Sequence, residues 1–317
     1  MSQHSPSSAL ESATPLKQKL ADESAAARKD LKQHEFSRSD YQRLLDLCER
    51  TIAQLEKQGI EAGAGGRLAR HRRVLSDLIA SMENADADVV RPSDSEVYLT
   101  GLELGQLSYV VAGLVQSSGH GNQRVAELVL SDGGLPAGAM GDRRFKLQFA
   151  AMSRLAGVRT VPPQGGAQCD CFVESDRWRF GVVAHVLSVD ADTDAAIQLC
   201  SQRFRADRTP GLMVLEITNL VWPERKVIRV ASDTVAAAEL QRRADSFLAS
   251  HRQRIAAGVD PVYAFGLLVV ATLPTYNVAT HHVAFSTSFR IASLCPEGDP
   301  RLERLAAFAR QFQRLGG

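Results

Sequence analysis

The 317-residue chain has the composition of an ordinary globular protein, with 44% hydrophobic and 23% charged residues. Its 37 basic and 36 acidic residues give a net charge of +1, so any nucleic-acid-binding surface must be local. The five cysteines are scattered through a chain too large to need disulfides, which favours a reducing compartment. No export signal or membrane-length apolar run is visible, so we expect a cytoplasmic protein that does not enter a membrane.

The first part of the chain is expected to be helical after a disordered tail. Residues 1–14 are polar and Ser-rich and predict the tail. Between 15 and 90, apolar residues recur at helical spacing on both sides of a Gly-Ala-Gly-Gly segment, which predicts a helical hairpin suited to packing or self-association. Residues 91–140 are expected to form a helical connector, with a helix at Ser95–Val115 and a Gly- and Pro-rich loop at Asp132–Gly141.

From residue 141 to 317 the pattern alternates between helices and strands, which predicts an α/β domain with a partly parallel sheet. The expected helices are 142–156, Asp190–Phe204, Asp233 to about Ile255, and Pro300–Leu315. The expected strands are 168–174, 178–188, Leu212–Thr218, Tyr263–Leu273 and Val283–Ala292.

The stretches Gly141–Phe149, Gln168–Glu174, Trp178–Leu187 and Pro210–Thr218 together resemble the core of the PD-(D/E)XK nuclease superfamily. The resemblance implies a restriction-endonuclease-like mixed sheet flanked by helices. It also implies an acid on the first helix, an Asp entering the second strand, a Glu-x-Lys on the third strand and a Gln on the next helix. Such carboxylates suit Mg²⁺, which activates water and neutralises charge on the phosphate.

At the positions that this resemblance assigns, most of the catalytic residues are replaced. Lys146 stands in place of the helix acid, and a Val-Ala-His sequence ending at His185 replaces the Glu-x-Lys. Asp170 and Gln202 remain. Because two carboxylates are lost, most of the negative charge that would hold a divalent metal is missing. The resemblance therefore implies a pseudonuclease without a cofactor, in which Asp170, His185, Gln202 and Lys146 line a vestigial site.

The leading interpretation is a nuclease-fold protein that binds nucleic acid or a protein partner without cleaving it. In this interpretation Lys146 and His185 contact phosphate where metal and substrate would sit in an active nuclease. Inactive relatives of nucleases also serve as subunits of prokaryotic defence or DNA-processing assemblies. A second, purely structural interpretation is a scaffold that self-associates through its N-terminal helices.

An active enzyme remains a further alternative, because the acids could have moved. Asp170, Glu174 and Glu216 could bind Mg²⁺ or Mn²⁺, with His185 as the base. The competing interpretation is that Glu174 is solvated and that Glu216 pairs with an arginine such as Arg179.

Two arginine clusters could contact a phosphate backbone, although each is also typical of a solvated helix face. These clusters are Arg67, Arg70, Arg72 and Arg73 in the helical hairpin, and Arg203, Arg205 and Arg208 around the end of the helix predicted at Asp190–Phe204. Cys169, Cys171, Cys200 and His185 could bind zinc, but the Cys-x-Cys spacing is unlike that of common zinc sites. Buried free cysteines are the favoured interpretation.

Overall fold

The computed structural model describes residues 35–83, 94–114, 126–130, 137–175 and 178–312. The tail predicted for residues 1–14 lies outside these residues. The described helices are α3 (Arg38–Glu56), α4 (Gly66–Glu83), α5 (Asp94–Leu114), α7 (Ala137–Leu155), α8 (Asp192–Ala206), α9 (Thr218–Val221), α10 (Asp233–Gly258) and α11 (Arg301–Phe312). The strands are β1 (Arg159–Val161), β2 (Cys171–Glu174), β3 (Arg179–Val186), β4 (Gly211–Glu216), β5 (Ile228–Val230), β6 (Ala264–Asn277) and β7 (His282–Ser293).

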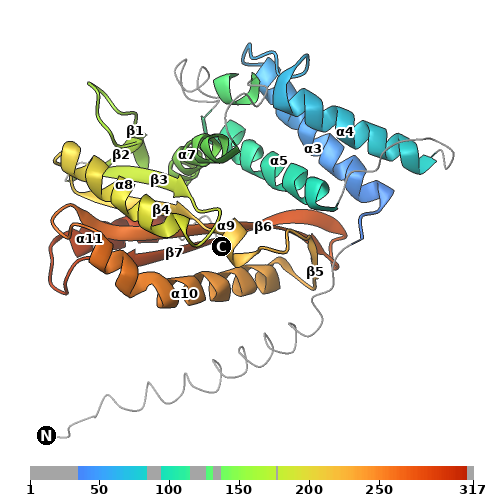
Figure 1. The fold of residues 1–317 in the computed structure, drawn as a ribbon. Helices are drawn as coiled ribbons and strands as arrows, with labels where there is room; N and C mark the ends of the chain where they lie inside the picture. The colour runs from blue at the N-terminus through green and yellow to red at the C-terminus, as the bar shows by residue number, and fades with distance from the viewer. Residues whose placement is uncertain (1–34, 84–93, 115–125, 131–136, 176–177, 313–317) are drawn as a thin grey trace, which may run out of the picture.

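The strands form one seven-stranded mixed sheet in the order β1-β2-β3-β4-β6-β5, with β7 also paired to β6 (Figure 1). Strands β1, β2 and β3 are antiparallel, whereas β3, β4 and β6 are parallel. The crossover from β3 to β4 runs through α8, as expected for parallel neighbours. The long strand β6 pairs first with β4 and then, at its end, with β5, while β7 follows its other side.

Both faces of the sheet are covered by helices, and each face has its own apolar core. Side chains of α8 and α10 pack on one face, as Cys200 and Leu240 do. Side chains of α7 and α11 pack on the other face, as Phe149 and Phe308 do. A third core joins α3, α4 and α5, and it includes Leu147 of α7. The N-terminal helices therefore pack directly on the α/β part (Figure 1).

The structure corrects several predicted boundaries. The loop expected at Asp132–Gly141 is wrong from Ala137 onward, because α7 begins there. The sequence pattern missed β1, β5 and α9, which have only three or four residues each. None of the helices in the described part of the chain combines the length and apolar character that a bilayer crossing requires.

Gly211 opens β4 where the ring of Phe204 from α8 lies against the strand backbone. A Cβ atom at this position would lie 2.0 Å from Phe204 Cε1. Because the ring is fully buried, it has no room to retreat. We expect Gly211→Ala to lower the free energy of unfolding by roughly 1–3 kcal/mol in denaturant titrations. Gly65→Ala is the control, since nothing lies within 4 Å of the added atom there.

Candidate functional site

The candidate site lies along the edge of β3 beyond the end of β2. Strand β2 pairs with β3 only as far as Val182. Beyond that point two carboxylates accept the backbone hydrogen bonds that a neighbouring strand would accept. Asp170 Oδ2 accepts the N–H of Ala184 at 2.9 Å, and Asp142 Oδ1 accepts the N–H of Val186 at 2.7 Å. These two hydrogen bonds satisfy the backbone N–H groups at the edge of β3, and they hold the two carboxylates in place.

Two cations from opposite faces of the sheet converge on Asp170. Lys146 Nζ from α7 lies 2.9 Å from Asp170 Oδ1, and Arg203 Nη1 from α8 lies 3.1 Å from the same oxygen. The side chains of Lys146 and Arg203 are 23% and 25% exposed, whereas Asp170 is 13% exposed. The carboxylate is therefore covered by the cations, which keep part of their surface open to solvent.

His185 lies at the same edge of the sheet and is held by Asp142. Its Nδ1 lies 2.8 Å from Asp142 Oδ2. Asp142 stands one helical turn before Lys146 on α7, so both side chains point to the edge of β3. Sequence reasoning overlooked Asp142, although its i, i+4 spacing from Lys146 was a usable signal.

Of the four residues predicted to line a vestigial site, the structure brings Lys146 and Asp170 into contact and places His185 along the same edge. Gln202 instead is exposed on α8, and its neighbour Arg203 contacts Asp170. Successive helix residues point about 100° apart, so only one of these two side chains can face the sheet edge.

The three acids proposed for a relocated metal site lie apart. Glu174 is four residues beyond Asp170, about 13 Å along a strand, and pairs with Arg159 and Arg179. The predicted pairing of Arg179 with Glu216 is therefore wrong. Across the residues that the structure describes, no group of three or more His, Cys, Asp or Glu side chains is arranged to hold a metal ion.

Glu216 is buried at the end of β4, where its Oε1 accepts the N–H of Thr218 at 3.0 Å. Burial raises the pKa of Glu216, while the bond from Thr218 and the charge of Arg144 oppose this rise. The pKa of Glu216 is therefore higher in the folded than in the unfolded protein. Below the unfolded pKa the carboxyl is protonated in both states and the protein keeps its full stability. Part of that stability is lost as pH rises through the folded pKa.

We therefore expect Glu216→Gln to stabilise the protein at neutral pH. The amide keeps an acceptor for Thr218 and removes the buried charge. The expected gain in the free energy of unfolding is on the order of 1 kcal/mol, the size of typical single stabilising changes. Urea titrations at neutral and acidic pH measure it, and the gain should shrink in acid, where the wild-type carboxyl is already protonated.

The three cysteines weighed as zinc ligands are buried free thiols, as the favoured interpretation expected. Cys169, Cys171 and Cys200 are buried and free. Burial raises the pKa of Cys169 and of Cys200, which disfavours the thiolate that zinc requires.

The arginines of the two predicted clusters have different partners. Arg203 and Arg205 bind Asp170 and Asp260, and Arg67 binds Glu103. Arg72 donates to the carbonyl of Gly63, whereas Arg70, Arg73 and Arg208 are exposed.

Glu103 of α5 is the centre of a second charged cluster. Its carboxylate lies 2.6 Å from Arg67 of α4, 3.2 Å from His71 of α4 and 3.4 Å from Arg144 of α7. Burial opposes ionisation of Glu103, but the contact with His71 and the charges of Arg144 and Arg67 lower its pKa to about 2. This cluster joins three helices through one shared carboxylate.

In comparisons with known proteins, no family model matches the chain, and no match was found among the curated proteins or the solved structures.

Proposed function

We propose that this protein has a restriction-endonuclease-like fold without nuclease activity and binds the phosphate backbone of nucleic acid at the β3 edge. The element order α7-β1-β2-β3-α8-β4, with antiparallel β2 and β3 and parallel β3 and β4, supports the fold assignment. It contains the helix, strand pair, crossover helix and parallel strand that the sequence resemblance implies.

The observation that carries the proposal is the convergence of Lys146 and Arg203 on Asp170. A divalent metal needs carboxylate oxygens, and here two cations occupy the surroundings of the carboxylate. The chemistry of this edge therefore fits an anion better than a metal ion.

Lys146 and Arg203 keep donors for a phosphate while they hold Asp170. An ammonium group has three N–H donors and a guanidinium group has five, and each needs only one for the contact with Asp170. The carboxylate between them offsets the repulsion that would otherwise separate the two cations. A phosphate oxygen can then be bound by both side chains at once, which is the geometry that favours charge-assisted hydrogen bonds.

The test is a binding and cleavage assay on labelled single- and double-stranded DNA and RNA at low salt. We expect retention of nucleic acid in EDTA, weakening with added salt, and no cleavage with Mn²⁺. We expect binding to weaken in Lys146→Met, in the double variant with His185→Ala, and in Arg203→Met. The expected loss is roughly tenfold in affinity, which corresponds to about 1.4 kcal/mol of binding free energy.

Matched controls separate a local effect from a change of net charge. Lys226→Met and Arg252→Met remove exposed cations outside the site and should leave affinity near the wild-type value. Equal affinities for the site variants and the controls would refute the proposal. Cleavage that requires Mn²⁺ and disappears in Asp170→Ala would instead establish an active nuclease.

A further inference from the structure

Strand β7 forms an open edge of the sheet. Strands β4 and β5 share one side of β6, and β7 occupies the other side, where it pairs with β6 alone in the described part of the chain. Every residue of β6 except Tyr276 is buried. In β7, by contrast, only Ser286 and Ser288 are buried among the residues from 283 to 293. The partial exposure of the rest is what an uncovered edge produces.

The odd-numbered residues of β7 direct their backbone groups away from the sheet. Leu294, just after the strand, donates its N–H to Phe265 of β6. Backbone direction alternates along a strand, so the even positions of β7 face β6. The N–H and C=O groups of Phe285, Thr287 and Phe289 therefore point outward and can accept a further strand.

This edge lacks the charges and prolines that usually prevent strand addition. Between Val283 and Ser293 the only charged residue is Arg290. Its guanidinium is paired with Asp245 of α10, 2.7 Å away, and so lies over one face of the sheet. In the described part of the chain the outer side of β7 is long, mostly apolar in its alternate positions and not paired with another strand, while α3 lies near it.

The sequence of the edge is symmetric about Thr287 at all but one pair of positions. Ser286 and Ser288 flank this residue, Phe285 and Phe289 follow, Ala284 and Arg290 differ, and an apolar pair at 283 and 291 comes next. We propose that β7 pairs antiparallel with β7 of a second copy about a twofold axis at Thr287. In this register Phe285 of one copy lies opposite Phe289 of the other. Each residue between 283 and 291 whose backbone groups point outward then stands opposite another such residue. A twofold interface requires such self-complementarity.

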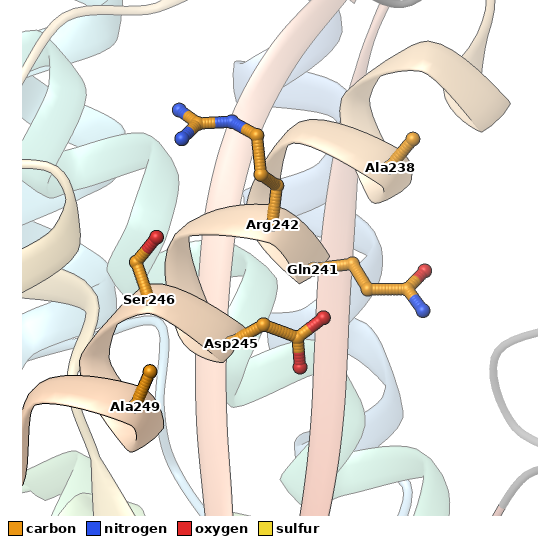
Figure 2. A pocket seen from close by; sticks show the side chains of 6 residues that line it. All are labelled: Ala238, Gln241, Arg242, Asp245, Ser246 and Ala249. Atoms are coloured by element: carbon orange, nitrogen blue, oxygen red, sulfur yellow. The ribbon is translucent and has the colours of Figure 1, made fainter. Parts of the chain in front are cut away.

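Helices α3, α10 and α11 lie near β7, and hollows border the strand on both faces of the sheet. A groove of about 450 Å³ lies between β7 and α11, lined in part by Phe289 and Ile291. On the other face, Figure 2 shows Gln241 and Asp245 projecting from one flank of α10, around a shallow hollow. Asp245 is the partner of Arg290, so this flank borders the edge strand.

The size of this face suits a stable dimer. Nine paired residues extend about 30 Å at ~3.3 Å per residue. With a helix layer about 10 Å thick on each side of the sheet, the face is about 30 Å wide. Each copy then offers at most roughly 900 Å², or about 1,800 Å² in total, because α11 with its 12 residues is shorter than the edge; this upper value lies within the range of stable interfaces.

The test is sedimentation velocity of the full chain over a wide concentration range. We expect a concentration-dependent species with twice the mass of one chain. Ala284 lies opposite Arg290 of the second copy in the proposed register, and this pair occurs twice by symmetry. Ala284→Glu should therefore tighten the dimer and Ala284→Lys weaken it, each roughly fivefold, because two cross-strand charge pairs change together.

Thr287→Pro supplies an independent test of the backbone pairing. Proline is tolerated in an edge strand where the N–H faces outward, so the fold should persist, as circular dichroism can verify. The dimer should weaken at least about tenfold, because the substitution removes outward N–H groups at the centre of the interface.

Three results would overturn the proposal. One is a monomer at all concentrations. Another is a dimer that responds alike to Ala284→Glu and Ala284→Lys. The third is a monomeric full chain that dimerises only after deletion of residues 1–34, which would show that this segment covers the edge instead of a second copy.

Discussion

Glu103→Gln is expected to lower the free energy of unfolding at neutral pH by about 3 kcal/mol, since it leaves a largely buried cluster of cations without a counter-charge. The side chains of Glu103, Arg67 and Arg144 are only 12%, 20% and 20% exposed. They come from α5, α4 and α7, so the loss loosens three helices at once.

The pH dependence gives the same magnitude by a separate route. The pKa of Glu103 falls from the usual 4.5 to about 2 in the folded protein. A depressed folded pKa contributes stability that is present above the unfolded pKa and is lost as pH falls from 4.5 toward 2. At 1.36 kcal/mol per pKa unit this contribution is about 3 kcal/mol. Urea titrations across this range should show a loss in the wild type that the variant lacks.

Glu83→Gln is the matched control for this prediction. Glu83 pairs with Arg38, but both side chains are more than half exposed, at 52% and 58%. An exposed ion pair contributes less than about 1 kcal/mol. If Glu103→Gln cost no more than Glu83→Gln, the cluster would not be a stabilising connection between the helices.

Strand and helix periodicity predicted the elements that carry Lys146, Asp170 and His185, which are α7, the start of β2 and β3. That these three residues lie together was implied by the resemblance, not by periodicity. The exchange of Gln202 for Arg203 was not predictable in this way. A shift of one position on a helix is smaller than the accuracy of a periodicity argument, yet it changes which side chain reaches the carboxylate.

Strand β6 shows a different reason for a missed boundary. The sequence predicted its end at Leu273, and the next residue, Pro274, lacks the N–H that a central strand needs. The structure continues β6 through Pro274 to Asn277. The N–H of Thr272 and the carbonyl of Val270 face the side of β4, so position 274 faces that side too. There β4 has already ended and β5 begins only opposite Thr275, so no partner is lost.

The short elements β1, β5 and α9 were missed because three or four residues are too few to show a period. Their positions depend on contacts between distant parts of the chain. Thr218 in α9, for example, accepts the N–H of Thr272 through its side-chain oxygen. No local pattern encodes such a contact.

Asp170→Asn is expected to have opposite effects on stability and on nucleic-acid affinity. The amide oxygen can still accept the N–H of Ala184, but Lys146 and Arg203 lose their shared counter-charge. Both cations are about one quarter exposed, so solvent screens part of their repulsion. We expect a loss of about 1–2 kcal/mol in the free energy of unfolding, below the value for a fully buried pair.

The same substitution removes the anion that competes with phosphate for Lys146 and Arg203. It also weakens the force that holds the two cations together, but a bound phosphate supplies that force itself. The first effect should therefore prevail, and binding of labelled DNA in EDTA at low salt should strengthen roughly tenfold.

Asp194→Asn is the control for this change in affinity, because it makes the same change of net charge at a side chain that is 59% exposed and bound to Arg254. It should leave affinity close to that of the wild type. An affinity for Asp170→Asn that is unchanged or reduced would mean that Lys146 and Arg203 serve only to join α7 and α8 to the edge of β3. A gain confined to Asp170→Asn would establish that these two cations bind the phosphate and that the carboxylate tunes their strength.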